Sequence, residues 1–265
     1  MKENELQSLD QKSILSLLSI FNEIGIDVEI SENKLITNEI NKVNSVSKNS
    51  NENNKLTSPE KKALEISLQA KDINSLKELF ENFNGCLLKK TAANFVPFEG
   101  NKNSKILIVD GSPESNEDKA GRPFAGERGI LFKKMLQSIN LKKEDIFITN
   151  AIPWRPPGNR YPTRDEINIC KPFIFHLIFL LNPKIILCMG DVAINQILDL
   201  NKNITNSRGK WYNFDNIFFK KSFEDEKQIM VLSTHNVSYL LKRPETKRQA
   251  WDDLKLLQNK IKEII

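Results

Sequence analysis

Asn150 has a residue type and a position in the sequence that suit a chemical role. It follows a short apolar run at 146–148 and precedes a loop that contains Trp154, Arg155 and Arg160. An amide side chain carries both a hydrogen-bond donor and an acceptor. At the carboxyl end of a strand in an α/β sheet, such a side chain with a basic loop behind it is typical of a ligand site. On its own, the same pattern also fits a capping asparagine before a solvated loop.

Three other apolar runs also end in small or polar residues. Residues 105–109 lead into Asp110-Gly111-Ser112-Pro113, residues 184–189 into Gly190, and residues 229–232 into Ser233-Thr234-His235-Asn236. Together with the run before Asn150, they predict four buried strands. Because the carboxyl ends of parallel strands meet at one edge of a sheet, we expect the functional residues there. The expected positions are 110–124, 150–160, 190 and 234–239.

Helical patterns surround and separate these strands. Helices are expected at about 59–70, 73–83, 130–138, 163–181, 192–198 and 244–265. Thr163 and Glu166 have the spacing of a capping box at the start of one of them. The charged stretch 117–129 is interpreted as a loop, and 203–219 as an irregular or β segment. Strands alternating with helices predict a three-layer α/β/α fold with a central, mostly parallel sheet of about four strands.

The composition indicates an ordinary globular protein. The 265 residues are 39% hydrophobic and 28% charged, and the net charge is +5. Three widely spaced cysteines argue against a disulfide framework and for a reducing compartment. No apolar run is long enough to span a bilayer, and the charged N-terminus lacks the profile of a secretory signal. We therefore expect a cytoplasmic monomer that makes no membrane contact.

Four parts of the chain differ in composition. Apolar periodicity predicts an N-terminal helix within residues 1–30, and an asparagine-rich stretch predicts a disordered linker at 31–57. A helical lead-in is expected at 58–85. The main domain is expected at 86–265.

Three stretches carry a resemblance to a known family. They are E-D-K-A-G-R-P-F-A-G-E-R-G at 117–129, I-T-N-A-I-P-W-R-P-P-G-N-R at 148–160 and S-Y-L-L-K-R-P-E-T-K-R-Q-A-W-D-D-L at 238–254. The chain resembles the uracil-DNA glycosylase superfamily over residues 83–256, most of all its family-four, iron–sulfur branch. This resemblance implies the superfamily fold and a hydrolase of DNA repair. Such an enzyme hydrolyses the N-glycosidic bond of uracil in DNA during base excision repair.

The resemblance also implies a pocket for a base that has been flipped out of the DNA stack. Phe124 matches the aromatic residue that stacks on the base, which recovers about 1–3 kcal/mol of stacking. Asn150 matches the amide that pairs with uracil O4 and N3–H, a pattern that cytosine reverses. Without the resemblance, Phe124 would be interpreted as a core residue.

Both catalytic motifs depart from the family. Gly111 stands where the family has a glutamate that helps to position the attacking water, so Ser112 or Asp110 is left to hold it. Asp110 lies one residue before the position of that glutamate. In an extended strand, a shift of one residue points the side chain to the opposite face. Asn236 aligns with the histidine that stabilises the departing uracil anion, and loss of such a donor commonly costs about 10²–10³ in rate. His235 would enter the pocket only if the register slipped by one residue.

The metal-binding positions are also altered. Family-four enzymes hold a [4Fe–4S] cluster on four cysteines. Cys86 and Cys170 match two of these positions, whereas Phe83 and Trp154 occupy the other two. We therefore expect no cluster and no other metal, with packing of Phe83 and Trp154 in its place. Cys188 is expected in the core.

The DNA-binding side matches the family more fully. Uracil-containing DNA is the expected partner, contacted by residues that reach phosphates or wedge into the duplex. The predicted contacts are Pro113, Arg155, Arg160, Tyr239, Leu240, Lys242 and Arg243. The N-terminal helix is a candidate docking segment for another repair or replication protein. Two alternatives to the uracil glycosylase stay open, namely a catalytically impaired DNA-binding relative and a glycosylase with shifted base specificity.

Overall fold

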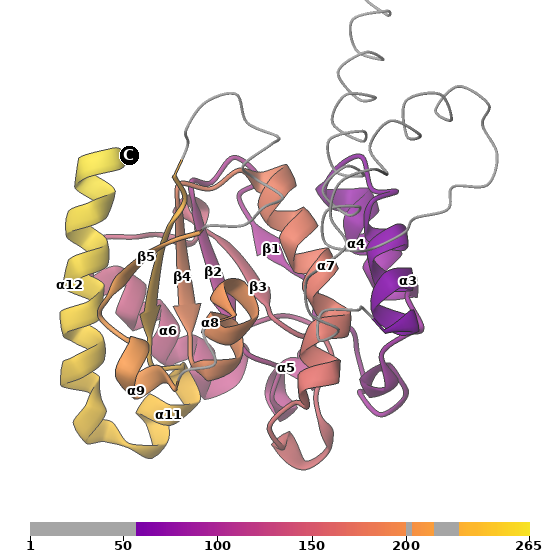
Figure 1. Ribbon diagram of the computed structural model, residues 1–265. Helices are drawn as coiled ribbons and strands as arrows, with labels where there is room; N and C mark the ends of the chain where they lie inside the picture. The colour runs from indigo at the N-terminus through magenta and orange to yellow at the C-terminus, as the bar shows by residue number, and fades with distance from the viewer. Residues whose placement is uncertain (1–56, 200–202, 215–227) are drawn as a thin grey trace, which may run out of the picture. The chain divides into compact units, whose positions relative to one another are not determined.

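A six-stranded sheet flanked by helices forms the framework of the protein (Figure 1). The computed structural model describes residues 57–199, 203–214 and 228–265. The predicted N-terminal helix and nearly all of the asparagine-rich linker lie outside these residues. The predicted α/β fold is confirmed. In the described part of the chain, no helix has the length and apolar character that a membrane span requires.

The sheet has four parallel strands at its centre and an antiparallel strand at each edge. Its order is β1 (Glu99–Gly100), β3 (Phe147–Asn150), β2 (Ile106–Asp110), β4 (Ile185–Met189), β6 (Met230–Thr234) and β5 (Trp211–Asn213). The strands β2, β3 and β4 are buried along their whole length, as is typical of parallel strands covered on both faces. The four predicted strands are these central ones. The edge strand β1 carries too few residues to produce a recognisable pattern, whereas β5 lies within 203–219, the segment interpreted as irregular or β.

Each of the six helical segments predicted within the described residues forms a helix, and the structure adds three short helices that were not predicted. The helices are α3 (Ser58–Ser67), α4 (Ile73–Asn82), α5 (Ser115–Ala120), α6 (Gly126–Ser138), α7 (Arg164–Leu181), α8 (Asp191–Leu198), α9 (Ile204–Ser207), α11 (Val237–Lys242) and α12 (Lys247–Ile264). Short 3-10 turns occur at η2 (Leu87–Lys90), η3 (Lys143–Asp145), η4 (Pro157–Asn159) and η5 (Pro244–Thr246). The loop predicted at 117–129 is wrong in part, because α5 and the first turn of α6 lie within it. At six residues, α5 is too short to show helical periodicity.

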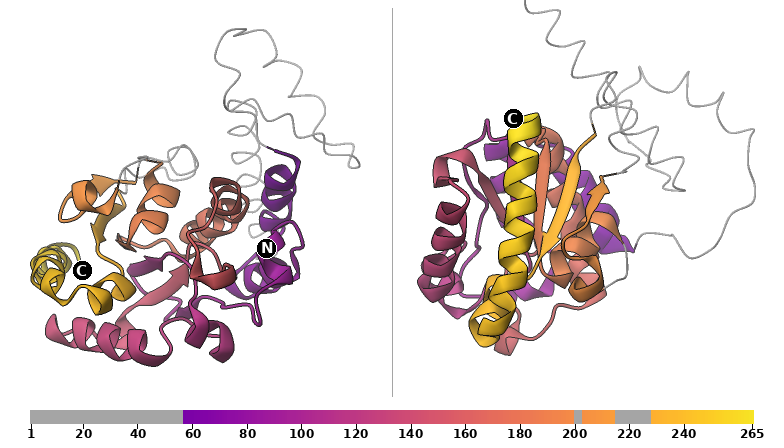
Figure 2. Two further views of the ribbon diagram at one scale, coloured as in Figure 1. Left: turned by 90° about the horizontal axis from the view of Figure 1, so that it is seen from below. Right: turned by 90° about the vertical axis from the view of Figure 1, so that its left-hand side faces the viewer.

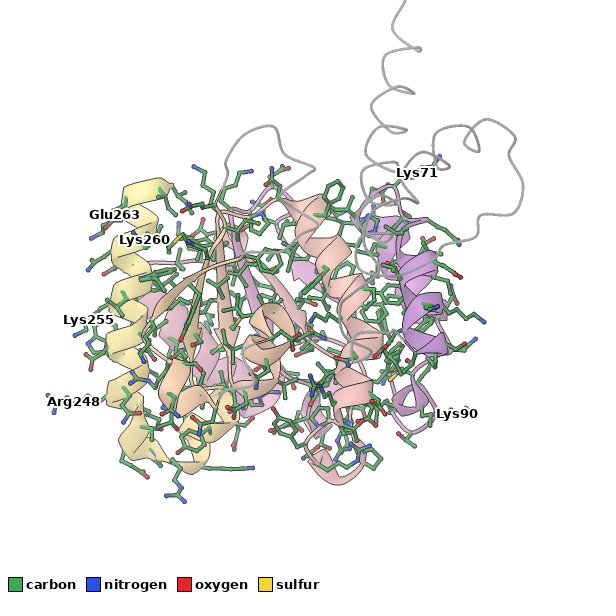
Figure 3. The ribbon with its side chains drawn as sticks, in the orientation of Figure 1. Lys71, Lys90, Arg248, Lys255, Lys260 and Glu263 are labelled. Atoms are coloured by element: carbon green, nitrogen blue, oxygen red, sulfur yellow. The ribbon has the colours of Figure 1, made fainter. Side chains whose placement is uncertain are left out.

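Two groups of helices cover the two faces of the sheet (Figure 2). Residues of α6, α11 and α12 form one apolar core with Ile106 and Ile108 of β2, Ile148 of β3 and Ile146, which precedes β3. On the other face α8 contacts β2 and β4, and α7 contacts α8. The helices α3 and α4 pack against α7, within the same compact unit as the sheet. The basic side chains Arg248 and Lys255 lie on the outer side of α12 (Figure 3), whereas the Lys260 ammonium lies 5.9 Å from the centroid of the Trp211 ring of β5.

The capping box predicted at Thr163 is confirmed at the start of α7. The Thr163 hydroxyl accepts a hydrogen bond from the Glu166 amide at 3.2 Å, and the Glu166 carboxylate accepts one from the Thr163 amide at 2.8 Å. Thr163→Ala should therefore lower the free energy of unfolding by about 1 kcal/mol. Urea denaturation of both proteins measures this difference. Thr163→Ser, which keeps the hydroxyl, should be close to the parent, and an equal loss in both variants would contradict the capping explanation.

Candidate active site

The predicted functional residues gather at the carboxyl ends of the parallel strands. Asp110 and Asn150 are paired in register at the ends of β2 and β3. Gly190 directly follows β4, and His235 and Asn236 follow β6. A Cβ atom placed on Gly190 would lie 3.0 Å from Nδ2 of Asn236, so these two strand ends approach closely. The topology thus brings four separate segments to one edge of the sheet, as expected for a ligand site.

Asn150 has a buried side chain with no hydrogen-bond partner. It is 2% exposed, and both Oδ1 and Nδ2 are unpaired within the protein. The backbone beside it is held firmly, because the next amide donates to the Asp110 carbonyl at 2.7 Å and Gln196 Nε2 donates to the Ala151 carbonyl at 2.9 Å. A buried amide with both its donor and its acceptor unsatisfied costs stability unless a water or a ligand pairs with it.

Phe124 is held in a strained backbone conformation between α5 and α6. Its φ of 51° lies in the left-handed region, which is unusual for a residue other than glycine. Its amide donates to Glu117 Oε1 at 2.7 Å, and its ring stacks on Phe132 with 3.8 Å between the centroids. A Cβ atom on Gly129 would collide with the Phe124 carbonyl oxygen, so the start of α6 requires glycine there. The ring is therefore fixed from several sides.

A buried cluster of three charged side chains adjoins Phe124. The Arg128 guanidinium forms ion pairs with both Asp110 and Glu117, and all three residues are buried. Burial raises the pKa of Asp110, although Arg128 opposes the shift. Burial likewise raises the pKa of Glu117 to about 7. The Asp110 carboxylate is thus bound to Arg128, so its predicted contact with substrate stays a prediction.

Gly111 and Ser112 differ in their surroundings from Asp110. A Cβ atom on Gly111 would lie 3.4 Å from Cβ of Val192 in α8, whereas Asp110 faces Arg128 of α6 on the other side of the sheet. This is the alternation that an extended strand imposes. Ser112 is partly exposed beyond the strand end.

Asn236 caps α11, while His235 faces α12. Oδ1 of Asn236 accepts the Tyr239 amide at 2.7 Å, which leaves its Nδ2 group beside Gly190. Nε2 of His235 forms a 2.8 Å hydrogen bond with the side-chain oxygen of Gln249, and its ring stacks on Tyr239 at 4.8 Å. The His235 imidazole is therefore held against α12 by the hydrogen bond of its Nε2 atom. The Nδ2 group of Asn236 lies near the strand ends and can donate a hydrogen bond there.

The predicted DNA-contacting residues have different exposures. Tyr239 is 42% exposed, and Lys242 and Arg243 are exposed at the end of α11. Leu240, a predicted DNA contact, is 1% exposed and belongs to the core, so its side chain offers almost no surface to a ligand. Helical phase turns Leu241 outward instead, with 36% exposure.

The other predicted DNA contacts lie on the loops that follow β2 and β3. Pro113 is buried, so it can shape its loop but offers little surface to a ligand. Arg155 donates to the Asn159 side chain at 2.6 Å, and Arg160 forms a two-pronged pair with Glu166 at 2.6 and 2.8 Å. The positive charge of Arg160 is thus largely neutralised by the Glu166 carboxylate. Arg155 has a weaker ion pair, at 3.9 Å from the Asp118 carboxylate.

The four positions of a family-four iron–sulfur cluster do not offer four thiolates. Cys86 and Cys170 are buried free thiols that hydrogen-bond each other, which lowers the pKa of Cys86, while burial raises that of Cys170. Phe83 and Trp154 are buried with them. No group of three or more His, Cys, Asp or Glu side chains in the described ranges could hold a metal. The residues present do not fit the cluster.

Aromatic rings fill the region around these two cysteines. Phe80 stacks on Phe173 at 4.1 Å and meets Trp154 edge-on at 5.4 Å. Phe83 contacts Phe173 at 5.2 Å, and a Cβ atom on Gly85 would collide with the Phe83 ring. The region is thus packed by side chains that have no metal-binding atoms. Cys188, as predicted, is in the core, within β4.

Three residues near the site were not anticipated from the sequence. Glu117 and Arg128 lie eleven positions apart in a segment interpreted as a charged loop, and no local pattern marks them as partners. Gln196 lies on α8 and reaches across to the segment after Asn150. A buried charge is recognisable only once the surrounding helices are in place.

Comparison with known proteins shows which family this chain resembles. The family model "Uracil DNA glycosylase superfamily" matches residues 97–255. A type-4 uracil-DNA glycosylase of Pyrobaculum aerophilum is 37% identical over 129 residues, which are 49% of this chain and 66% of that protein. The type-4 enzymes of Archaeoglobus fulgidus and Thermotoga maritima are each 33% identical, over 64% and 71% of this chain and 83% and 93% of their own lengths.

Proposed function

Since the chain belongs to the uracil-DNA glycosylase superfamily, we propose that it is a DNA glycosylase that removes uracil from DNA. It hydrolyses the N-glycosidic bond and leaves an abasic site, as the first step of base excision repair. The observation that carries this proposal is the Asn150 side chain, which is buried with its donor and its acceptor both unpaired. That pair of groups matches O4 and N3–H of uracil.

Recognition is assigned to Phe124 and Asn150. The enzyme extrudes the uracil nucleotide from the stack, which costs a few kcal/mol. The Phe124 ring replaces part of the lost stacking. Asn150 Nδ2 donates to uracil O4, and its Oδ1 accepts from N3–H. Cytosine presents a donor and an acceptor in the reverse order, so the same amide orientation rejects it.

Bond cleavage is assigned to Asn236 and Ser112. As the bond between C1′ and N1 breaks, its electron pair moves into the uracil ring, and the Asn236 Nδ2 group donates to the developing charge on O2. The Ser112 hydroxyl, partly exposed at the end of β2, holds the water that attacks C1′. Asn236 is a neutral donor, and Gly111 has no side chain to activate the water, so slow turnover is expected.

DNA contacts are assigned to cations near the strand ends, of which Lys242 and Arg243 are exposed and Arg155 is partly buried. Arg155, Lys242 and Arg243 neutralise phosphates, which supplies affinity without sequence information. Tyr239, with Leu241 rather than Leu240, faces the duplex at the start of the path along which the base leaves. Arg160 contributes less, because Glu166 already binds its guanidinium.

We also propose that the protein folds without an iron–sulfur cluster, because aromatic packing of Phe83 and Trp154 takes the place of two ligands. Prolonged treatment with a metal chelator is therefore expected to leave the melting temperature unchanged. Differential scanning calorimetry before and after treatment measures it, and elemental analysis of untreated protein reports iron. Stoichiometric iron with visible absorbance, or a fall in melting temperature on chelation, would contradict this.

A second function is favoured by Gly111 and Asn236 taken together. Without the family's carboxylate and imidazole, the chain could bind uracil-containing or abasic DNA with little turnover. Incubation of the purified protein with single- and double-stranded uracil oligonucleotides, followed by alkali, separates the two functions. Alkali-labile product at the uracil supports the glycosylase. Saturable binding without cleavage, on uracil and on other damaged bases such as hypoxanthine, supports the binding protein.

A further inference from the structure

We propose that Arg128 is a positioning residue for base recognition: through Glu117 and Asp110 it fixes the two halves of the base site, Phe124 and Asn150, in one arrangement. This inference rests on the proposed function, because it concerns the same site. It assigns a role to three buried charges that the recognition and cleavage steps do not use directly.

The first half of the arrangement runs from Arg128 through Glu117 to Phe124. Glu117 accepts the Phe124 amide at 2.7 Å and the Glu114 amide at 2.8 Å, and its carboxylate also binds Arg128. Phe124 needs such support, because its φ of 51° is unfavourable for a residue with a side chain. The Arg128 guanidinium also lies 5.6 Å from the centroid of the Phe124 ring. Arg128 thus braces both the backbone and the ring.

The second half runs from Arg128 through Asp110 to Asn150. Asp110 ends β2 directly beside Asn150 of β3, and the amide after Asn150 donates to the Asp110 carbonyl at 2.7 Å. The ion pair with Arg128 fixes the Asp110 side chain against α6. Asp110 and Asn150 occupy equivalent register positions, so their side chains extend to the same face of the sheet, the face that α6 covers. Among the residues that the structure describes, Arg128 is therefore the side chain that bonds to both supporting carboxylates.

Because the three charged side chains are buried, an unpaired charge among them would cost stability. A buried charge is costly unless it is paired, and removal of Arg128 would leave two carboxylates close together without a counter-charge. Nε of Arg128 has no hydrogen-bond partner, so the hydrogen bonding within this network is incomplete. Buried ion pairs can often be replaced by apolar residues without loss of stability, so stability alone does not account for this network. Its position between the stacking ring and the reading amide supports a role in recognition.

Glu117 gives the network a pH dependence. The groups that face it are Arg128 and Asp110 together with the Glu114 and Phe124 amides, and burial raises its pKa to about 7. Above pH 7 the ionised carboxylate holds Arg128 and the Phe124 amide more strongly than its protonated form does. KM for a uracil oligonucleotide is therefore expected to fall as pH rises through 7. In Glu117→Gln this step should be absent, because the amide does not titrate.

The decisive variant is Arg128→Lys, which keeps the charge but loses the planar fork that binds two carboxylates at once. The first measurement is hydrogen exchange of the segment that contains Phe124, followed by mass spectrometry. Exchange there is expected to accelerate about tenfold or more, a rise that follows from a weakened amide hydrogen bond. Lys134→Met removes an exposed charge from the same helix and should leave exchange unchanged. This measurement does not depend on turnover, so it stands even if the proposed function fails.

The second measurement is a double-mutant cycle on uracil excision. Arg128→Lys should raise KM by roughly 10-fold to 10²-fold, the range expected when a binding group is misplaced by a fraction of an ångström to 1 Å. In a Phe124→Ala background the same substitution should have much less effect, because its target is gone. Unchanged exchange at Phe124 in folded Arg128→Lys, or fully additive effects in the cycle, would overturn the proposal. Absence of uracil excision by the parent protein would instead count against the proposed function.

Discussion

Asn150→Ala is expected to lower kcat/KM for uracil excision by at least about 10²–10³-fold, the loss typical of removing a preorganised hydrogen-bonding group from an active site. The reason is that Asn150 is buried with both polar atoms unpaired, so no protein group substitutes for it when the base is bound. The loss should appear mainly in kcat/KM on uracil oligonucleotides, measured under single-turnover conditions.

The fold should tolerate this change. No side-chain hydrogen bond within the protein is broken, so the melting temperature of Asn150→Ala should stay near or above that of the parent. Asn213→Ala is a matched control, because Asn213 is an exposed asparagine on the edge strand β5. Full activity in Asn150→Ala would remove the basis for placing the base against this residue. Loss of activity with loss of folded structure would point to a structural role instead.

Asn236→His is expected to raise kcat for uracil excision by about 10²–10³-fold, because a histidine donor is restored where the leaving group carries charge. The same change should cost stability. Asn236 Oδ1 accepts the Tyr239 amide at 2.7 Å as the cap of α11, and loss of such a cap costs about 1 kcal/mol. A gain in rate with a lower melting temperature is therefore the expected combination.

Asn236→Ser separates these two contributions. Serine keeps a capping oxygen but has no amide to donate to uracil, so stability should be retained while activity falls below that of the parent. If Asn236→His brings no gain and His235→Ala abolishes excision, the register assigned to this segment is wrong. His235 would then be the residue that reaches the leaving group, after release from Gln249.

The central strands and the long helices were predictable because their signals are local. Continuous apolar runs such as 105–109 mark strands buried on both faces, and the capping box at Thr163 marks the start of α7. The helix α5 and the strand β1 were not predicted, because six and two residues are too few for periodicity to emerge. Their positions depend on what packs around them.

For the residues of the candidate site, too, some features were predictable from the sequence and others were not. The position of Asn150 at a strand end was readable from the apolar run before it, and the family resemblance supplied its partner Phe124. The directions in which the side chains of adjacent residues point could not be predicted from the sequence. His235 and Asn236 are adjacent in sequence, yet one bonds to Gln249 of α12 and the other caps α11. Leu240 and Leu241 differ in the same way, one in the core and one outside.

The sequence by itself determined the order of the four central strands and the long helices, the strand-end position of Asn150, and the absence of four cysteines at the cluster positions. Only the tertiary structure decided that Glu117 and Arg128 meet Asp110 in the interior beside Phe124. The physical reason is that strand and helix signals arise from neighbouring residues, whereas the pairing of buried charges depends on desolvation. Desolvation exists only after helix α6 has closed over the sheet, and it turns three ordinary surface-type residues into a supporting network.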